Sequence, residues 1–133
     1  MPIQCVNPPA LFPSAQYGFS QIAVTSGRRQ VFISGQTAWN EHQHIVGGTD
    51  LGAQTRQALR NVTTAVEAAG GTLANVGSLR IYFVANVAND VGAIGAALRE
   101  YFPANPPAST WVGIACLARP EFLVEVEATA VLD

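Results

Sequence analysis

Residues 122–131 read "FLVEVEATAV", an apolar run that holds two carboxylates, Glu125 and Glu127. Side chains alternate between the two faces of an extended strand, so the run predicts a strand with both glutamates on one face and valine and alanine on the other. From the pattern alone, two interpretations of the polar face stay open. Either the glutamates meet solvent or pair with Arg80 or Arg119, or one of them activates water as a general base in a cleft between subunits.

The composition of the 133-residue chain predicts one domain, residues 1–133, with part of its surface covered by other subunits. Hydrophobic residues make up 49% of the chain and charged residues 12%, against about 25% charged in an ordinary soluble domain. Little charge is therefore available to keep the surface in water. The 7 basic and 9 acidic residues give a net charge of -2, which offers no electrostatic grip on a phosphate backbone and predicts no nucleic-acid partner.

The ends and the cysteines of the chain bear on its location. The N-terminal "MPIQCVNPPALF" has no basic start followed by an apolar stretch, and no apolar run approaches the ~18 residues of a membrane-spanning helix. We therefore expect a cytoplasmic protein with no membrane partner. Cys5 and Cys116 lack the spacing of a zinc or redox pair, so free thiols are expected, with Cys116 buried on one face of its strand.

Hydrophobic periodicity predicts the element order β-β-α-β-α-β-β and hence an α+β fold class. A proline-rich arm over residues 1–16 is predicted to be irregular, because proline removes backbone donors. Strands at 19–24 and 30–36 are separated by the turn sequence "TSGRR" and are predicted to form a hairpin. Strands at 109–117 and 122–131 are predicted to form a second hairpin around "ARPE".

Two helices are predicted between these strands. Apolar residues at helical spacing predict a helix over residues 49–69, which a pair of glycines ends. A strand at 76–85 follows, and Asn89 then caps a second helix that Pro103 ends. Each strand-helix-strand passage is long enough for a right-handed crossover, so both helices are expected on one face of a mixed sheet.

The other face of that sheet is expected to lack a covering helix. A face with aromatic and apolar side chains is costly to leave in water, and a second copy of the same sheet is its simplest cover. Any function is therefore expected where copies meet. The residues expected on this open face are Arg80, Tyr82, Trp111, Glu125 and Glu127.

Motifs for cofactor and metal chemistry are absent from the sequence. No glycine-rich nucleotide loop, GxSxG or HExxH pattern occurs, so neither a cofactor nor a metal is expected. His42 and His44 have no third ligand at a suitable spacing and are interpreted as exposed loop histidines. Since both lie in one polar loop and nothing places Cys116 near them, a Ser/His/Asp or Cys/His device is disfavoured.

Longer stretches of the sequence resemble the RidA/YjgF family of small proteins. The similarity extends from about Phe19 onward, and its most specific parts are "LRNV" in the first helix and "VEVEA" in the last strand. The resemblance implies a chorismate-mutase-like fold, a variant of the ferredoxin-like fold, in a homotrimer with a central barrel and three clefts between subunits. The stretches that carry it are "VFISGQTA", "QTRQALRNVTTAVEAAGGTLANV", "RIYFVANVAND" and "PPASTWVGIACLARPEFLVEVEATAV".

The best-known branch of this family hydrolyses enamines and imines, released by pyridoxal-phosphate enzymes, to 2-keto acids and ammonia without a cofactor. By resemblance, Glu125 is the water-positioning residue. If the chain is an enzyme, backbone groups near Ser34 and Gly35 are expected to hold the substrate. In that branch an arginine after "PA" grips the substrate carboxylate through two hydrogen bonds. Ser109 stands at that position here, so the chain is a divergent member without the guanidinium.

Further positions of the same cleft also differ from that branch. The tyrosine of the family's "YSQ" is Phe19 here, and Tyr17, two residues away, is a candidate to replace its hydroxyl. An asparagine often present in the second helix falls at about Gly95. Trp111 could supply a flat apolar wall for a neutral or cationic ligand, and the competing interpretation makes it core or interface filler.

Two functions stay open at this point. The first is a cofactor-independent hydrolytic deaminase of a small imine or enamine that is inefficient on 2-imino acids, because Ser109 cannot clamp a carboxylate. The second is a non-catalytic trimer that binds a small metabolite or regulates a partner. An endoribonuclease, a name that some family members carry, is disfavoured by the acidic charge balance.

Overall fold

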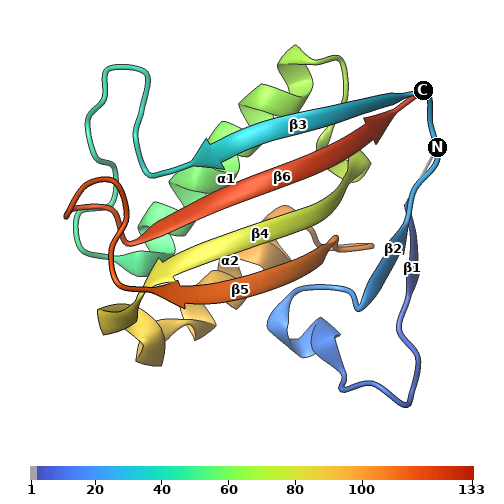
Figure 1. Ribbon diagram of the computed structural model, residues 1–133, viewed down its shortest axis with the longest axis horizontal. Coiled ribbons are helices and arrows are strands. Elements are labelled where there is room, and N and C mark those ends of the chain that lie inside the picture. Colours follow the sequence, from blue (N-terminus) through green and yellow to red (C-terminus); the bar gives the residue numbers. More distant parts are fainter. Residues whose placement is uncertain (1–2) are drawn as a thin grey trace.

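Strand β6 (Val124–Leu132), which contains both glutamates, lies inside a four-stranded sheet in the computed structural model, which describes residues 3–133. It pairs antiparallel with β3 (Arg29–Gln36) on one side and with β4 (Val76–Val84) on the other. Strand β5 (Ala108–Ile114) pairs parallel with β4, so the order is β3-β6-β4-β5 (Figure 1). The predicted strand is therefore held by main-chain hydrogen bonds on both of its edges.

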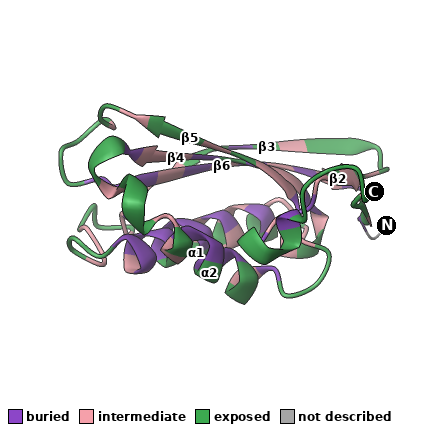
Figure 2. Ribbon diagram, turned by 90° about the horizontal axis from the view of Figure 1, so that it is seen from below, coloured by how far each residue is buried: buried purple, intermediate pink, exposed green. Residues whose placement is uncertain are grey.

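Two α-helices, α1 (Leu51–Ala68) and α2 (Gly92–Tyr101), lie on one face of this sheet (Figure 2). Helix α1 connects β3 to β4 and α2 connects β4 to β5, which confirms the predicted mixed sheet with two helices on one face. Neither helix is long and apolar enough to cross a membrane, and the same holds for every other helix of residues 3–133. Short 3-10 turns at Leu73–Asn75 and Ala85–Asp90 flank β4.

The hydrophobic core lies between the helices and the sheet. Its side chains come from alternate positions of β4 and β6 and from the inward stripes of α1 and α2, as the periodicity predicts. Burying each such side chain contributes roughly 1.5–3 kcal/mol to folding. The fully buried apolar side chains include Leu59, Val62, Val66, Leu79, Ile81, Ile94, Leu98, Val124 and Val126.

Both predicted hairpins are wrong. Strand β2 (Ile22–Val24) pairs with β1 (Gln4–Val6) instead of β3, and β4 separates β5 from β6. Turn residues indicate only that the chain changes direction, whereas the neighbour of a strand depends on burial of a whole face. The inward side of β6 is apolar from Val124 to Leu132 and is best covered at the centre, beneath both helices.

The N-terminal arm is more ordered than its prolines suggest. Residues 1–16 were expected to be irregular, but β1 and a 3-10 turn at Ser14–Tyr17 lie in or at the end of this range, and residues 1 and 2 lie outside the described part. The arm contacts the segment before β5 through the Cys5 thiol, which donates to the Pro106 carbonyl at 3.4 Å, and the Ser20 amide just after the arm donates to the Pro107 carbonyl at 3.1 Å. Proline prevents donation at its own position only, so its neighbours still form a ladder.

The sheet face opposite the helices is open, as predicted (Figure 2). In the register of β4 with β6, Arg80 lies opposite Glu127, and Tyr82 lies opposite Glu125. The Tyr82 hydroxyl lies 3.4 Å from the Glu127 carboxylate. Phe32 on β3 is 76% exposed on the same face, because its partner Thr129 alternates with the buried positions of β6.

Two side chains lie elsewhere than predicted. Trp111 pairs with the buried Ile81 across the parallel β4–β5 ladder, so it faces the helices and packs against the core instead of lying on the open face. On this edge strand, an indole buries more of its apolar surface beside the core than on the open face of the sheet. Cys116 was expected to be buried, but it follows the end of β5 and is exposed.

Candidate functional site

Glu125 lies on the open face of β6, beside an irregular stretch of β3. The β3–β6 register shifts between Ile33 and Gln36, and Gly35 lies in this interruption. A Cβ atom added to Gly35 would be 2.7 Å from Cδ and 2.9 Å from Cγ of Glu125, closer than side-chain atoms approach. Glycine therefore leaves the space that the carboxylate occupies at this position. The structure brings Gly35 and Glu125 of the predicted site together, and Ser34, which directly precedes Gly35 on β3, is exposed.

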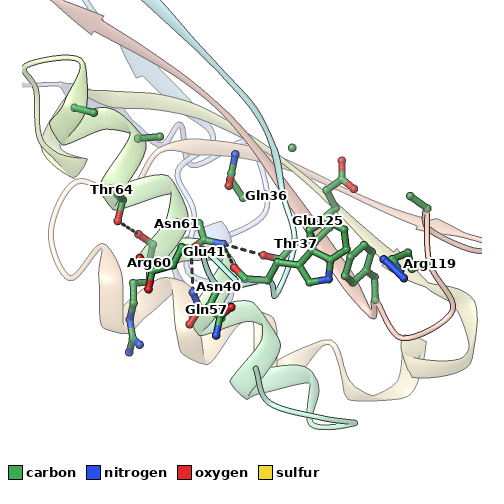
Figure 3. A pocket seen from close by; sticks show the side chains of 16 residues that line it. Gln36, Thr37, Asn40, Glu41, Gln57, Arg60, Asn61, Thr64, Arg119 and Glu125 are labelled. Atoms are coloured by element: carbon green, nitrogen blue, oxygen red, sulfur yellow. Dashed lines mark hydrogen bonds between the residues drawn. The ribbon is translucent and has the colours of Figure 1, made fainter. Parts of the chain in front are cut away.

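A cavity of about 850 Å³ opens beside Glu125 and Gly35. Its wall combines the end of β3 and the loop after it, the outer side of α1, and the segment that leads into β6 (Figure 3). The volume is within the range of small-molecule sites. The charged groups on the wall are Glu41, Arg60, Arg119 and Glu125.

Asn61 on α1 fixes the loop that follows β3. Its amide nitrogen donates to the main-chain carbonyls of Thr37 at 3.0 Å and Trp39 at 2.8 Å, and its oxygen accepts from the Gln57 amide at 2.9 Å (Figure 3). Two carbonyls that leave the sheet ladder thus find their donors on the helix. The helix thereby sets the position of Trp39 on the cavity wall.

Trp39, Phe122 and Arg119 form an aromatic and cationic stack on that wall. The rings of Trp39 and Phe122 meet edge to face with centroids 5.0 Å apart, and the Arg119 guanidinium lies 5.2 Å from the Trp39 ring centroid. A cation over an indole ring contributes about 0.5–1 kcal/mol at an exposed site. The stack therefore fixes the direction of a guanidinium that half faces solvent.

The segment that carries this stack is anchored by Gln54, a fully buried side chain of α1. The Gln54 amide oxygen accepts from the Leu123 main-chain nitrogen at 2.9 Å. Its amide nitrogen donates to the carbonyls of Gly48 at 2.7 Å and Glu121 at 2.9 Å. One side chain therefore holds the loop before α1 and the start of β6 in a fixed relation.

The remaining predicted site residues form a second group near the N-terminal arm. The rings of Phe19 and Trp111 lie 5.8 Å apart, and Phe12 contacts both Phe19 and Tyr17 at centroid distances of 6.1 and 6.2 Å. The Trp111 indole nitrogen donates to the Ser109 hydroxyl at 3.0 Å. This hydrogen bond gives Ser109 a definite role, which is to satisfy the tryptophan.

Within one chain the two groups do not meet. Ser109 and Trp111 pair with Leu79 and Ile81 and so face the helices, whereas Glu125 faces away from them on the far side of β4. None of the second group lines the cavity beside Glu125. The predicted site residues therefore form two separate groups within one chain.

The histidines and the basic residues determine which metal sites and amine groups the chain can provide. The rings of His42 and His44 lie 6.1 Å apart in a loop, and no group of three or more metal-ligating side chains gathers within residues 3–133. All 7 basic residues are arginines, so no side-chain amine exists to form a Schiff base.

Sequence reasoning missed the side chains that shape the cavity wall. Trp39 stands in the polar stretch "TAWNEHQH", and a lone tryptophan there was the available signal that the loop packs against another segment. The alternation of "FLVEVEATAV" predicts only that Phe122 begins a strand and does not indicate the loop that it contacts. Asn61 belongs to "LRNV", but its two bonds to carbonyls of a distant loop have no local signature.

The comparisons with known proteins agree with the fold. A family model described as Endoribonuclease L-PSP matches residues 10–132. The structure of a protein of unknown function of the conserved Rid protein family, YyfB from Yersinia pestis, is 41% identical, with 99% of this chain and 100% of that chain covered and a TM-score of 0.93.

Two further solved structures are more distant. A member of the highly conserved YjgF/YER057c/UK114 family from Mycobacterium tuberculosis is 29% identical over 98% of this chain and 99% of that chain, with a TM-score of 0.67. TdcF from E. coli, solved with bound serine, is 25% identical over 100% and 99% of the two chains, with a TM-score of 0.71.

Proposed function

Because this chain belongs to the endoribonuclease L-PSP family, which includes the Rid and YjgF proteins, we propose that it is a homotrimer that hydrolyses a small imine or enamine without a cofactor. The observation that carries this proposal is the Glu125 carboxylate, held against Gly35 at the edge of an 850 Å³ cavity. A carboxylate in such a cleft accepts a proton from water and directs the oxygen at an electrophilic carbon.

The reaction needs only water and one proton carrier. Water adds to the imine carbon, and Glu125 takes the proton that water loses and passes it to the substrate nitrogen, which gives a carbinolamine. The carbon–nitrogen bond then breaks as Glu125 takes the proton of the hydroxyl and passes it to the departing nitrogen, which leaves a carbonyl compound and ammonia. The chain has no lysine, so a Schiff base with a side chain is not an alternative route.

A second copy of the chain would complete the cleft. Glu125 and Gly35 form one half-site, and Phe19, Tyr17, Ser109 and Trp111 form the other, on opposite sides of one sheet. Packing the open face against neighbouring copies would also cover Phe32 and Tyr82. These two requirements support the trimer that the family resemblance implies.

Ser109 limits the substrates that this cleft would accept. Its hydroxyl carries no charge and already accepts a hydrogen bond from Trp111. A 2-imino acid would therefore meet no clamp for its carboxylate on β5, in contrast to two charge-assisted hydrogen bonds from an arginine. TdcF holds a bound serine, which supports a cleft of small-molecule size in this chain too.

The same contact favours a second candidate function. If the hydrogen bond between Trp111 and Ser109 prevents imines from reacting in the cleft, the trimer would bind a small metabolite without hydrolysing it. The two functions share the cleft and differ only in whether Glu125 activates water.

Ammonia release from imines generated in the cuvette by an amine oxidase distinguishes them. We expect the parent protein to accelerate hydrolysis of a neutral imine and to have little effect on 2-iminobutyrate. Glu125→Gln should lower the rate by about 10²-fold or more, because the general base is lost. Glu127→Gln is the matched control, two residues away on the same face, and should retain activity within a few fold. No acceleration of any imine would contradict the enzyme and leave the binding trimer.

A further inference from the structure

The guanidinium of Arg119 is a cation without a hydrogen-bond acceptor of its own. Three of the six other arginines have one: Arg29 donates to the Asp133 carbonyl at 3.0 Å, Arg56 to Glu100 at 2.9 Å and Arg99 to the Gln16 carbonyl at 2.8 Å. Within residues 3–133, Arg119 has only a carboxylate of Glu121 at 3.8 Å, beyond hydrogen-bond distance, and the ring of Trp39. Its donors are therefore available to a ligand.

The position of Arg119 is defined even though its side chain is 54% exposed. Trp39 lies beneath the guanidinium, and Trp39 is itself held by Phe122 and by the bond of its carbonyl to Asn61. A guanidinium stacked on an aromatic ring keeps its edge donors free for an anion. The planar edge of Arg119 is thus presented at the cavity wall.

Arg119 and Glu125 line the same cavity but form no ion pair with each other. Because these two opposite charges are not paired with each other, one ligand with both a negative and a positive group can contact both side chains. The wall also contains apolar side chains, Phe122 and Ala118 among them, that suit a short hydrocarbon segment. The cavity therefore offers an anion site, an apolar stretch and a cation site.

We propose that this cavity binds small zwitterions in which a carboxylate and a basic or imine nitrogen are separated by several bonds, with the carboxylate on Arg119 and the nitrogen at Glu125. The inference rests on the proposed function, since it makes the nitrogen at Glu125 the reacting one. It differs from a 2-imino acid, whose nitrogen and carboxylate are attached to adjacent carbons. Arg119 is then the residue that determines substrate specificity.

Stable amines test the binding part of this inference. We would measure the affinity of γ-aminobutyrate by calorimetry, together with butylamine, butyrate and α-aminobutyrate. The zwitterion with separated charges should bind about tenfold more tightly than each of the other three, because one additional charge-assisted pair at a half-exposed site contributes on the order of 1.4 kcal/mol. Equal affinity for α-aminobutyrate and γ-aminobutyrate would overturn the proposal.

Substitutions of single arginines test whether Arg119 is the residue that binds the carboxylate. Arg119→Gln should reduce the affinity for γ-aminobutyrate about tenfold to the level of butylamine and leave butylamine itself unchanged, since only the carboxylate contact is lost. Arg28→Gln, in the exposed turn before β3, removes the same charge and should change nothing. Arg60→Gln removes the other arginine of the cavity wall, and loss of affinity there instead of at Arg119 would contradict the assignment.

The two proposals fail separately. Hydrolysis of a neutral imine by the parent protein, without any preference for γ-aminobutyrate, would sink this inference and leave the proposed function intact. Arg119-dependent binding of γ-aminobutyrate, without hydrolysis of any imine, would sink the proposed catalysis and leave the ligand class standing.

Discussion

At the scale of single residues, one glycine and one serine decide what the cleft can do. Gly35 admits the Glu125 carboxylate to the bulge of β3, and Ser109 accepts the indole hydrogen of Trp111. The first contact preserves a candidate base. The second involves the position at which the resemblance implies an arginine, so in the proposed cleft this difference would affect substrate binding and leave Glu125 in place.

Gly35→Ala tests the fit of the carboxylate. The added Cβ would displace the Glu125 side chain, and because the displaced atoms are the end of a flexible side chain, the free energy of unfolding should change by less than about 1 kcal/mol. Turnover of a neutral imine should fall at least about tenfold, since small misplacements of a catalytic group are costly.

Gly92→Ala provides the matched control for this variant. An added Cβ at Gly92 meets no atom within 4 Å, so that variant should retain both stability and turnover. Wild-type turnover in Gly35→Ala would show that the contact with Gly35 does not position the base.

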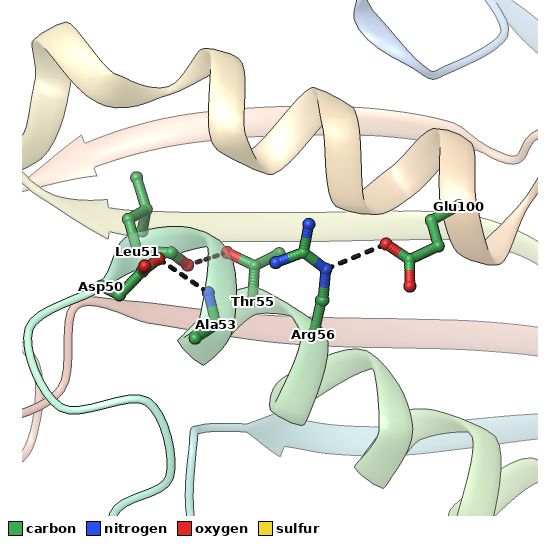
Figure 4. A network of polar contacts seen from close by, with 6 residues as sticks. All are labelled: Asp50, Leu51, Ala53, Thr55, Arg56 and Glu100. Atoms are coloured by element: carbon green, nitrogen blue, oxygen red, sulfur yellow. Dashed lines mark hydrogen bonds and ion pairs between the residues drawn. The ribbon is translucent and has the colours of Figure 1, made fainter.

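At the scale of secondary structure, the helix α1 organises both the core and the cavity wall. The Asp50 side chain caps it by accepting from the Ala53 amide at 3.0 Å, and Arg56 joins it to α2 through Glu100, a contact that raises the pKa of Arg56 (Figure 4). Its buried Gln54 then anchors the start of β6. The helix α1 therefore contacts α2, the start of β6 and the cavity wall, and it fixes the positions of these parts relative to one another.

Gln54→Leu tests this anchor. The substitution leaves the Leu123 amide and the carbonyls of Gly48 and Glu121 without their partner inside the protein. Because each unsatisfied buried group costs about 1–3 kcal/mol, we expect a loss of roughly 3 kcal/mol or more in the free energy of unfolding, measured by urea denaturation. Gln36→Leu, whose amide bonds only the nearby Ser34 carbonyl, should lose less than about 1 kcal/mol, and similar losses in both variants would contradict the anchor.

Hydrophobic periodicity depends on residues close in sequence, and it predicts the structural features that such residues determine. The helix stripes, the alternation of β6 and the shared face of Glu125 with Glu127 all follow from residues close in sequence. The partner of each strand does not, which is why β6 lies between β3 and β4 instead of beside β5. The cavity wall was missed for the same reason, since Trp39 and Phe122 meet across more than half of the chain.

At the scale of the whole molecule, the sheet is covered on one side only. Helices occupy one face (Figure 2), while the strand registers place Phe32, Tyr82 and Val112 on the other, together with both glutamates of β6. A sheet face that groups an exposed phenylalanine, 76% accessible, with other apolar side chains is unfavourable to leave in water. The proposed cleft makes the same requirement, because its two groups of residues lie on opposite sides of the sheet of one chain.

Phe32→Asp tests the assembly. We expect the parent protein to have the mass of a trimer by light scattering, and the variant to give a smaller species, because a carboxylate would be buried without a partner at the interface. Ala96→Asp introduces the same charge on the exposed side of α2 and should leave the mass unchanged. A parent protein with the mass of one chain would contradict the trimer.

The double pairing of β6 has a consequence for how this protein can change over evolutionary time. The backbone that carries Glu125 is fixed by neighbours on both edges, whereas Trp39 and Arg119 come from loops outside the sheet. In the proposed cleft, mutations in those loops would alter which molecule is recognised while the carboxylate keeps its place. Libraries confined to residues 39–46 and 115–121, which leave the positive-φ glycines Gly47 and Gly48 unchanged, should therefore yield folded proteins with new preferences.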